Sequence, residues 1–179
     1  MPTPRVVRRR RAVKAGLGLL ALSLVATAVA RLYLLGSSPP SAEKMAALSD
    51  QESQILRLVN AQRIRAGLKE LRLSAKLAII ARGHSYDMAM RRYLDHTSPD
   101  GVGPAERVRG AGISYDALGE NIYMGDYRED ETMPSHAVER WLASAEHRAT
   151  MLSREFTDTG IGVARAADGS IYVTQDFIR

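Results

Sequence analysis

Leu118-Gly119-Glu120-Asn121-Ile122-Tyr123 is a strand-like stretch that carries one carboxylate. One histidine-bearing segment, with His96, precedes it, and another, with His147, follows it. Both of these segments look loop-like or strand-like in the sequence. A glutamate flanked by two histidines is an arrangement used in acid/base chemistry and in metal binding. The stretch therefore predicts a functional site wherever the fold brings these three side chains together.

The composition indicates one globular domain with a basic tail. The chain has 179 residues, of which 45% are hydrophobic, and it contains no cysteine, so disulfides and thiolate chemistry are excluded. Residues 1–36 hold seven basic side chains and no acidic one, which leaves 18 basic against 20 acidic residues in the remainder. Because the net charge of that remainder is close to −2, we expect no nucleic-acid partner.

The first 36 residues are typical of an export signal. An arginine cluster at residues 8–11 precedes an apolar run over residues 15–35. Ala28-Val29-Ala30 fits a cleavage site, but the run of 21 residues, roughly 31 Å as a helix, is also long enough to anchor the chain in a membrane. Residues 1–36 are thus a signal peptide or a signal anchor. In both cases the basic flank stays in the cytoplasm and the body is exported.

A domain over residues 51–179 follows a Gly/Ser/Pro-rich linker at residues 37–50. Helical spacing predicts a helix from a Ser49/Glu52 capping box to Gly67, and a second helix with His84 on its buried face. Further helices are expected at residues 104–109 and after Pro134, and two strands at residues 160–165 and 171–177. This order predicts an α+β fold with antiparallel strands.

From Ile55 onward the chain resembles the CAP superfamily, the cysteine-rich secretory and venom-antigen proteins, and in particular its cysteine-free bacterial branch. The shared motifs are Leu58-Val59-Asn60-x-x-Arg63, Asp87-Met88, His96-Thr97-Ser98-Pro99, Gly119-Glu120-Asn121-Ile122, Trp141-x-x-Ser144, His147-Arg148-x-x-Met151-Leu152, Gly160-Ile161-Gly162-Val163 and Tyr172-Val173-Thr174-Gln175-Asp176-Phe177. Each motif alone is weak, but in this order they are specific. The resemblance implies a three-layer α-β-α sandwich around a central antiparallel sheet, and an extracellular or cell-envelope location.

The resemblance also implies a cleft lined by two histidines and two acidic residues, which binds a divalent metal in some members of the family. His96, Glu120 and His147 match three of the cleft positions and are the expected metal ligands, for zinc or another divalent cation. The fourth position, acidic in eukaryotic members, is Ser144 here. Glu146 is a nearby acidic residue, and we include it as a candidate cleft residue.

Two functions are open at this point. The first is a non-catalytic envelope module that binds a lipid, a glycan or an envelope protein and reaches the membrane through its N-terminal helix if that helix is uncleaved. The alternative is a metal-dependent, peptidase-like hydrolase that uses the same cleft. A His-Glu-x-x-His helix and a Gly-x-Ser-x-Gly elbow are both absent from the sequence. A purely structural hydrogen-bond cluster of the three residues is a third possibility.

Overall fold

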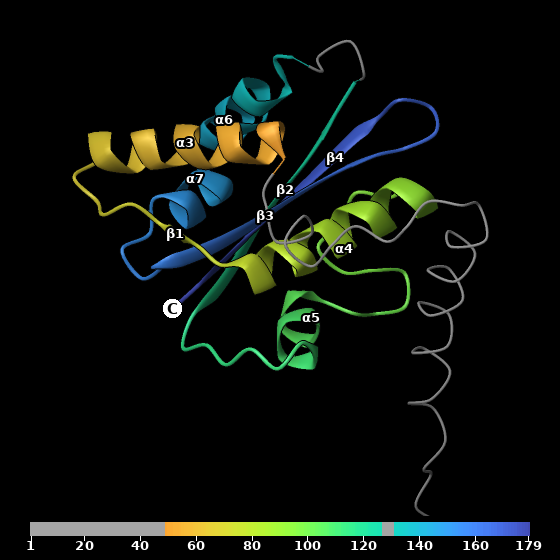
Figure 1. Ribbon diagram of the computed structural model, residues 1–179, viewed down its shortest axis with the longest axis horizontal. Helices are drawn as coiled ribbons and strands as arrows, with labels where there is room; N and C mark the ends of the chain where they lie inside the picture. Colours follow the sequence, from red (N-terminus) through yellow and green to blue (C-terminus); the bar gives the residue numbers. More distant parts are fainter. Residues whose placement is uncertain (1–48, 127–130) are drawn as a thin grey trace, which may run out of the picture. The chain divides into compact units, whose positions relative to one another are not determined.

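The computed structural model describes residues 49–126 and 131–179 (Figure 1). The predicted signal or anchor at residues 1–36 and most of the predicted linker lie outside these residues. The described residues form five helices and four strands. In chain order they are α3 (Asp50–Arg65), β1 (Arg72–Leu73), α4 (Ala75–Arg91), α5 (Pro104–Gly110), β2 (Leu118–Gly125), α6 (Met133–Ala143), α7 (Ala145–Met151), β3 (Asp158–Arg165) and β4 (Ile171–Ile178). Within the described ranges, no helix is long and apolar enough to span a membrane.

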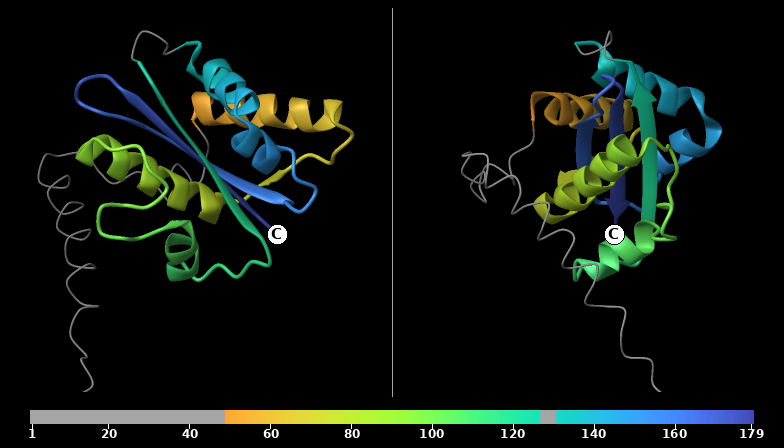
Figure 2. Two further views of the ribbon diagram at one scale, coloured as in Figure 1. Left: turned by 180° about the vertical axis from the view of Figure 1, so that it is seen from behind. Right: turned by 90° about the vertical axis from the view of Figure 1, so that its right-hand side faces the viewer.

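A twisted four-stranded sheet with the order β1-β3-β4-β2 forms the middle layer. Strands β3, β4 and β2 pair antiparallel, with Glu120 opposite Asp176 and Gly160 opposite Asp176 on its other side. Helices α3, α6 and α7 lie on one side of the sheet and α4 and α5 on the other, as Figures 1 and 2 show. The predicted three-layer sandwich with an antiparallel centre is therefore confirmed. The two-residue β1, parallel to β3, adds an edge that the sequence did not reveal.

The capping box that the sequence predicts at the start of α3 is present. The backbone N–H of Ser49 donates to Glu52 Oε2 (2.8 Å), and the N–H of Glu52 donates to Ser49 Oγ (3.2 Å). Glu52 is buried and also accepts from the Arg82 guanidinium on α4 and from the Val163 N–H on β3. One carboxylate thus joins the first helix to both other layers.

Two glycines of β3 set how closely α4 approaches the sheet. A Cβ at Gly160 would overlap the backbone of Leu77 and Ala78, and a Cβ at Gly162 would overlap the backbone of Ala81 and Arg82. Glycine is therefore required for close packing rather than for its φ angle. On α4, His84 is buried, and its Nε2 hydrogen-bonds the Asp95 carbonyl (3.0 Å), which confirms its place on the buried face.

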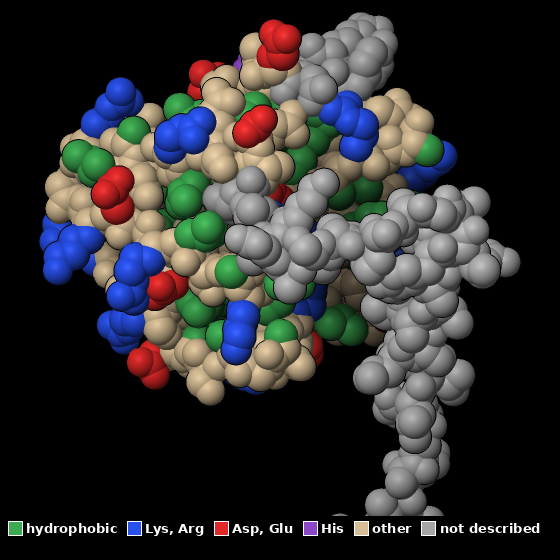
Figure 3. Space-filling model, viewed as in Figure 1, with side chains coloured by type: hydrophobic (Ala, Val, Ile, Leu, Met, Phe, Trp, Pro, Cys, Tyr) green, Lys and Arg blue, Asp and Glu red, His purple; other side chains and the backbone are tan. Residues whose placement is uncertain are grey.

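The main core lies between the sheet and the layer of α3 and α6. Trp141, the single tryptophan of the chain, is 1% exposed, and its Nε1–H donates to the Ile122 carbonyl of β2 (2.9 Å). A smaller cluster around Met88 and Tyr172 lies between α4 and the opposite face of the sheet. Acidic and basic side chains are interspersed on the surface seen in Figure 3. That view agrees with the near-neutral charge of the body.

Candidate functional site

Glu120 lies on β2 with its side chain on the sheet face that carries α4 and α5. Its side chain is 2% exposed. His96 Nδ1 lies 2.7 Å from Oε1, and Arg107 Nη2 donates to Oε2 at 2.6 Å. Both carboxylate oxygens are therefore engaged, one by a histidine from the loop after α4 and one by an arginine from α5.

These contacts shift the pKa values of both Glu120 and His96. Burial alone would raise the pKa of Glu120, but the hydrogen bond with His96 and the charge of Arg107 outweigh burial and lower it. The hydrogen bond with Glu120 raises the pKa of His96 against the opposing effect of partial burial. Glu120 is therefore ionised at neutral pH, and the pair favours a protonated imidazole more than an isolated histidine does.

Arg107 holds the His96 loop against β2. Its Nη1 donates to the carbonyls of His96 and Val102, both at 3.0 Å, while its Nη2 binds Glu120. Sequence reasoning placed a helix here but did not single out this residue. The available signal was a basic residue on a short helix that begins with Pro104 and ends at Gly110, with Gly112 soon after.

His147 approaches the same place from the other side of the sheet. The expectation of a loop-like or strand-like segment is wrong here, because His147 belongs to the helix α7. The side chain of Ser144 caps this helix by accepting from the His147 N–H at 3.5 Å. Asn121 Nδ2 on β2 donates to the His147 carbonyl (3.0 Å), and the rings of His96 and His147 are 6.5 Å apart. Burial and the neighbouring His96 lower the pKa of His147.

Ser144 and Glu146 both lie at the start of α7 beside His147, and the charge of Glu146 partly opposes the lowering of the His147 pKa. Ser144 caps α7, while the side chain of Glu146 is exposed on the first turn of that helix. Asp176 of β4, which sequence reasoning did not select, is instead the acid beside Glu120. It is 0% exposed, and its side chain lies against the carboxylate of Glu120. Burial and the neighbouring Glu120 charge raise the pKa of Asp176 well above its ordinary value.

The geometry does not fit a metal held by His96, His147 and Glu120 together. Glu120 has both oxygens committed to His96 and Arg107. In the parts of the chain that are described, no group of three or more His, Asp, Glu or Cys side chains is placed to hold a metal ion. What remains for a cation is the pair of imidazoles alone.

Residues 56–177 match the model of the CAP family, described as the cysteine-rich secretory protein family. The chain belongs to the CAP family. Curated relatives include the Bacillus subtilis protein YkwD, an uncharacterized protein, with 36% identity over 148 residues. That match covers 79% of this chain and 54% of YkwD. The membrane protein YlbC of B. subtilis, also uncharacterized, is 35% identical over 128 residues, which cover 72% of this chain and 34% of YlbC. This chain thus spans about half or less of the length of these relatives.

Solved structures share the fold. An extracellular protein of Bacillus anthracis with an SCP domain superimposes with a TM-score of 0.64 at 31% identity, covering 80% of this chain and 45% of that protein. An outer surface protein of Borrelia burgdorferi has a TM-score of 0.66 at 17% identity, covering 73% of this chain and 93% of that one. The second likeness concerns the fold alone.

Proposed function

We propose that this CAP protein is exported to the cell envelope and that its domain is a non-catalytic binding module, with the cleft of His96 and His147 as a ligand contact. Export is supported by the basic and apolar N-terminal sequence and by two similar proteins, one described as extracellular and one as a membrane protein. The module attaches to the membrane through its N-terminal segment when that segment is uncleaved. Its partners are a glycan, a lipid or a protein of the envelope.

The state of Glu120 carries the proposal. A general base needs an oxygen that can reach the proton it removes, or a water that it can activate. Glu120 instead has one oxygen on His96 and the other on Arg107, at 2.7 and 2.6 Å. This arrangement fixes the His96 ring and its loop, as a binding site requires, and leaves Glu120 without a free oxygen to act as the base of a peptidase-like hydrolase.

A divalent cation such as zinc enters the proposal only as a ligand of the two imidazoles. Zinc lies about 2.0–2.1 Å from a histidine nitrogen, so two histidines on one tetrahedral ion have ring centres roughly 5 Å apart. The ring centres of His96 and His147 are 6.5 Å apart, so the two rings must come closer to each other to share an ion. Weak binding, lost in either single alanine variant, is the expected result of a zinc titration.

Sedimentation of the full chain with purified envelope material tests the module. We expect the wild type to sediment with the envelope and to release no soluble fragments, with or without zinc. His96→Ala and His147→Ala should sediment less, while an alanine at the exposed Arg65 should behave as wild type. Release of peptide or sugar fragments that depends on His96 and His147 would instead establish the hydrolase.

A further inference from the structure

A hollow lies at the far end of β2 from Glu120. Its volume is about 690 Å³, within the roughly 300–1,000 Å³ common for small-molecule sites. We call it the β2–α6 cavity, because β2 and its extension line one side and α6 the other. Its lining residues are Tyr123, Met124, Gly125, Asp126, His136, Glu139, Arg140, Ala143 and Ser170.

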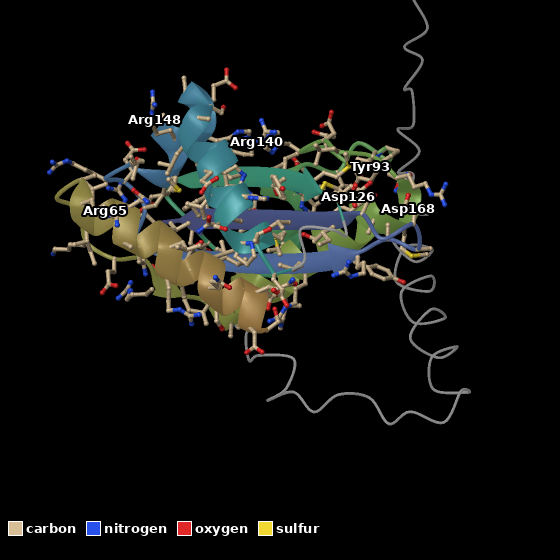
Figure 4. All side chains as sticks on the ribbon, turned by 90° about the horizontal axis from the view of Figure 1, so that it is seen from above. Arg65, Tyr93, Asp126, Arg140, Arg148 and Asp168 are labelled. Carbon is tan, nitrogen blue, oxygen red and sulfur yellow. The ribbon has the colours of Figure 1, made fainter. Side chains whose placement is uncertain are left out.

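The α6 wall is a continuous face of that helix. His136, Glu139, Arg140 and Ala143 recur at spacings of three and four residues, so they lie above one another on one side. Glu139 and Arg140 are exposed and hence accessible to a ligand. Figure 4 labels Arg140 on α6 and Asp126 just beyond the end of β2, the two elements that line the cavity.

The β2 wall presents the aromatic ring of Tyr123. The Tyr123 ring lies along Gly125, so close that a Cβ at Gly125 would be 2.6 Å from the tyrosine oxygen and 2.8 Å from Cε1. The lack of a side chain at Gly125 therefore makes room for the ring. An aromatic ring offers a broad apolar face together with a polar edge.

The cavity is polar but carries no excess of positive charge. Two carboxylates, Asp126 and Glu139, accompany one guanidinium, Arg140, and the hydroxyl of Ser170. A phosphate or polyanion site needs a cluster of arginines or lysines, which this lining lacks. Carboxylates accept and arginine donates several hydrogen bonds, so the set suits a neutral ligand rich in hydroxyl groups.

We infer that the β2–α6 cavity binds a neutral oligosaccharide. The ring of Tyr123 packs against the apolar face of a sugar ring, and Glu139 and Arg140 hydrogen-bond its hydroxyl groups. This inference rests on the proposed envelope-binding function and names its ligand class. The site is separate from the histidine cleft, because Tyr123 lies three residues beyond Glu120, roughly 10 Å along the strand, and on the opposite face of the sheet.

Calorimetric titration of the full chain with chitotetraose, a neutral four-sugar oligomer, tests the inference. Gly125→Ala keeps every lining side chain but displaces the Tyr123 ring, and Arg140→Ala removes one hydrogen-bonding group. Each should weaken binding by about tenfold or more. The matched controls are Gly83→Ala, where an added Cβ meets nothing within 4 Å, and Arg148→Ala at an exposed residue of α7. Both controls should bind as wild type.

An unchanged melting temperature shows that each variant is folded. The inference is overturned if the wild type does not bind chitotetraose, or if Gly125→Ala and Arg140→Ala bind as tightly as the two controls. It is also overturned if His96→Ala abolishes binding while Arg140→Ala does not. If the protein sediments with envelope material but does not bind chitotetraose, this inference alone is refuted. A chain that sediments with no envelope fraction refutes the proposed function.

Discussion

Replacing Arg63 by alanine should destabilise the folded domain by about 3–5 kcal/mol. Arg63 is 2% exposed on α3 and donates only to backbone carbonyls among the contacts described. The acceptors belong to Lys69 (3.0 Å), Met151 (2.8 Å), Ser153 (2.9 Å) and Phe156 (3.2 Å). One guanidinium thus ties the end of α7 and the loop before β3 to the first helix.

The magnitude follows from those four acceptors. A hydrogen bond from a charged donor contributes about 1.5–3 kcal/mol, and a buried acceptor left without a donor costs about 1–3 kcal/mol. Alanine leaves space for water to reach some of the carbonyls, so the loss should be well below four full contributions. Because total stabilities are about 5–15 kcal/mol, such a loss is large, and the melting temperature should fall by roughly 10–20 °C.

Urea unfolding followed by Trp141 fluorescence measures this loss. Trp141 is the single tryptophan and is almost fully buried, so its emission reports the core. Arg65→Ala, at an exposed position on the same helix, is the control and should change stability by less than about 0.5 kcal/mol. A loss at Arg63→Ala no greater than that of the control would refute the reasoning.

Three further predictions concern the site and the α4 interface. Asp176→Asn should be as stable as wild type near pH 4 and increasingly more stable as pH rises. Because the pKa of Asp176 is raised in the folded protein, the stability that this group contributes is present below its unfolded pKa of about 3.9 and is lost as the pH rises through its folded pKa. Urea unfolding at several pH values measures this loss. The same dependence of unfolding free energy on pH in both proteins would contradict the prediction. Glu120→Gln should lower the pKa of His96, which NMR titration of its ring protons measures. The wild type should lose stability as the pH rises through the folded pKa of His96, and the variant should not. An unchanged His96 titration would show that Glu120 does not raise the His96 pKa. Gly162→Ala should cost more than about 3 kcal/mol because its Cβ meets the rigid backbone of Arg82, and a soluble variant with wild-type unfolding would contradict the close packing.

Part of the site could be predicted from local pattern and resemblance. Glu120, His96 and His147 were selected from short motifs, and the structure brings the two imidazoles to 6.5 Å and His96 to 2.7 Å from Glu120. Arg107 and Asp176 were missed because their importance depends on which strand and helix lie beside Glu120. No spacing within α5 or β4 encodes that neighbourhood.

The sequence by itself determined most of the elements of this protein, although not β1 or the helix α7, and its family resemblance indicated the layers. The Ser49/Glu52 capping box, the stripe of α4 and the paired C-terminal strands are local signals, since hydrogen-bonding caps and side-chain periodicity act over a few residues. Only the tertiary structure decided that Arg107 occupies the second oxygen of Glu120 and that the rings of His96 and His147 lie 6.5 Å apart. These contacts depend on the way α5 and α7 approach β2. Strand register and helix approach are set by packing over the whole core and not by any single segment.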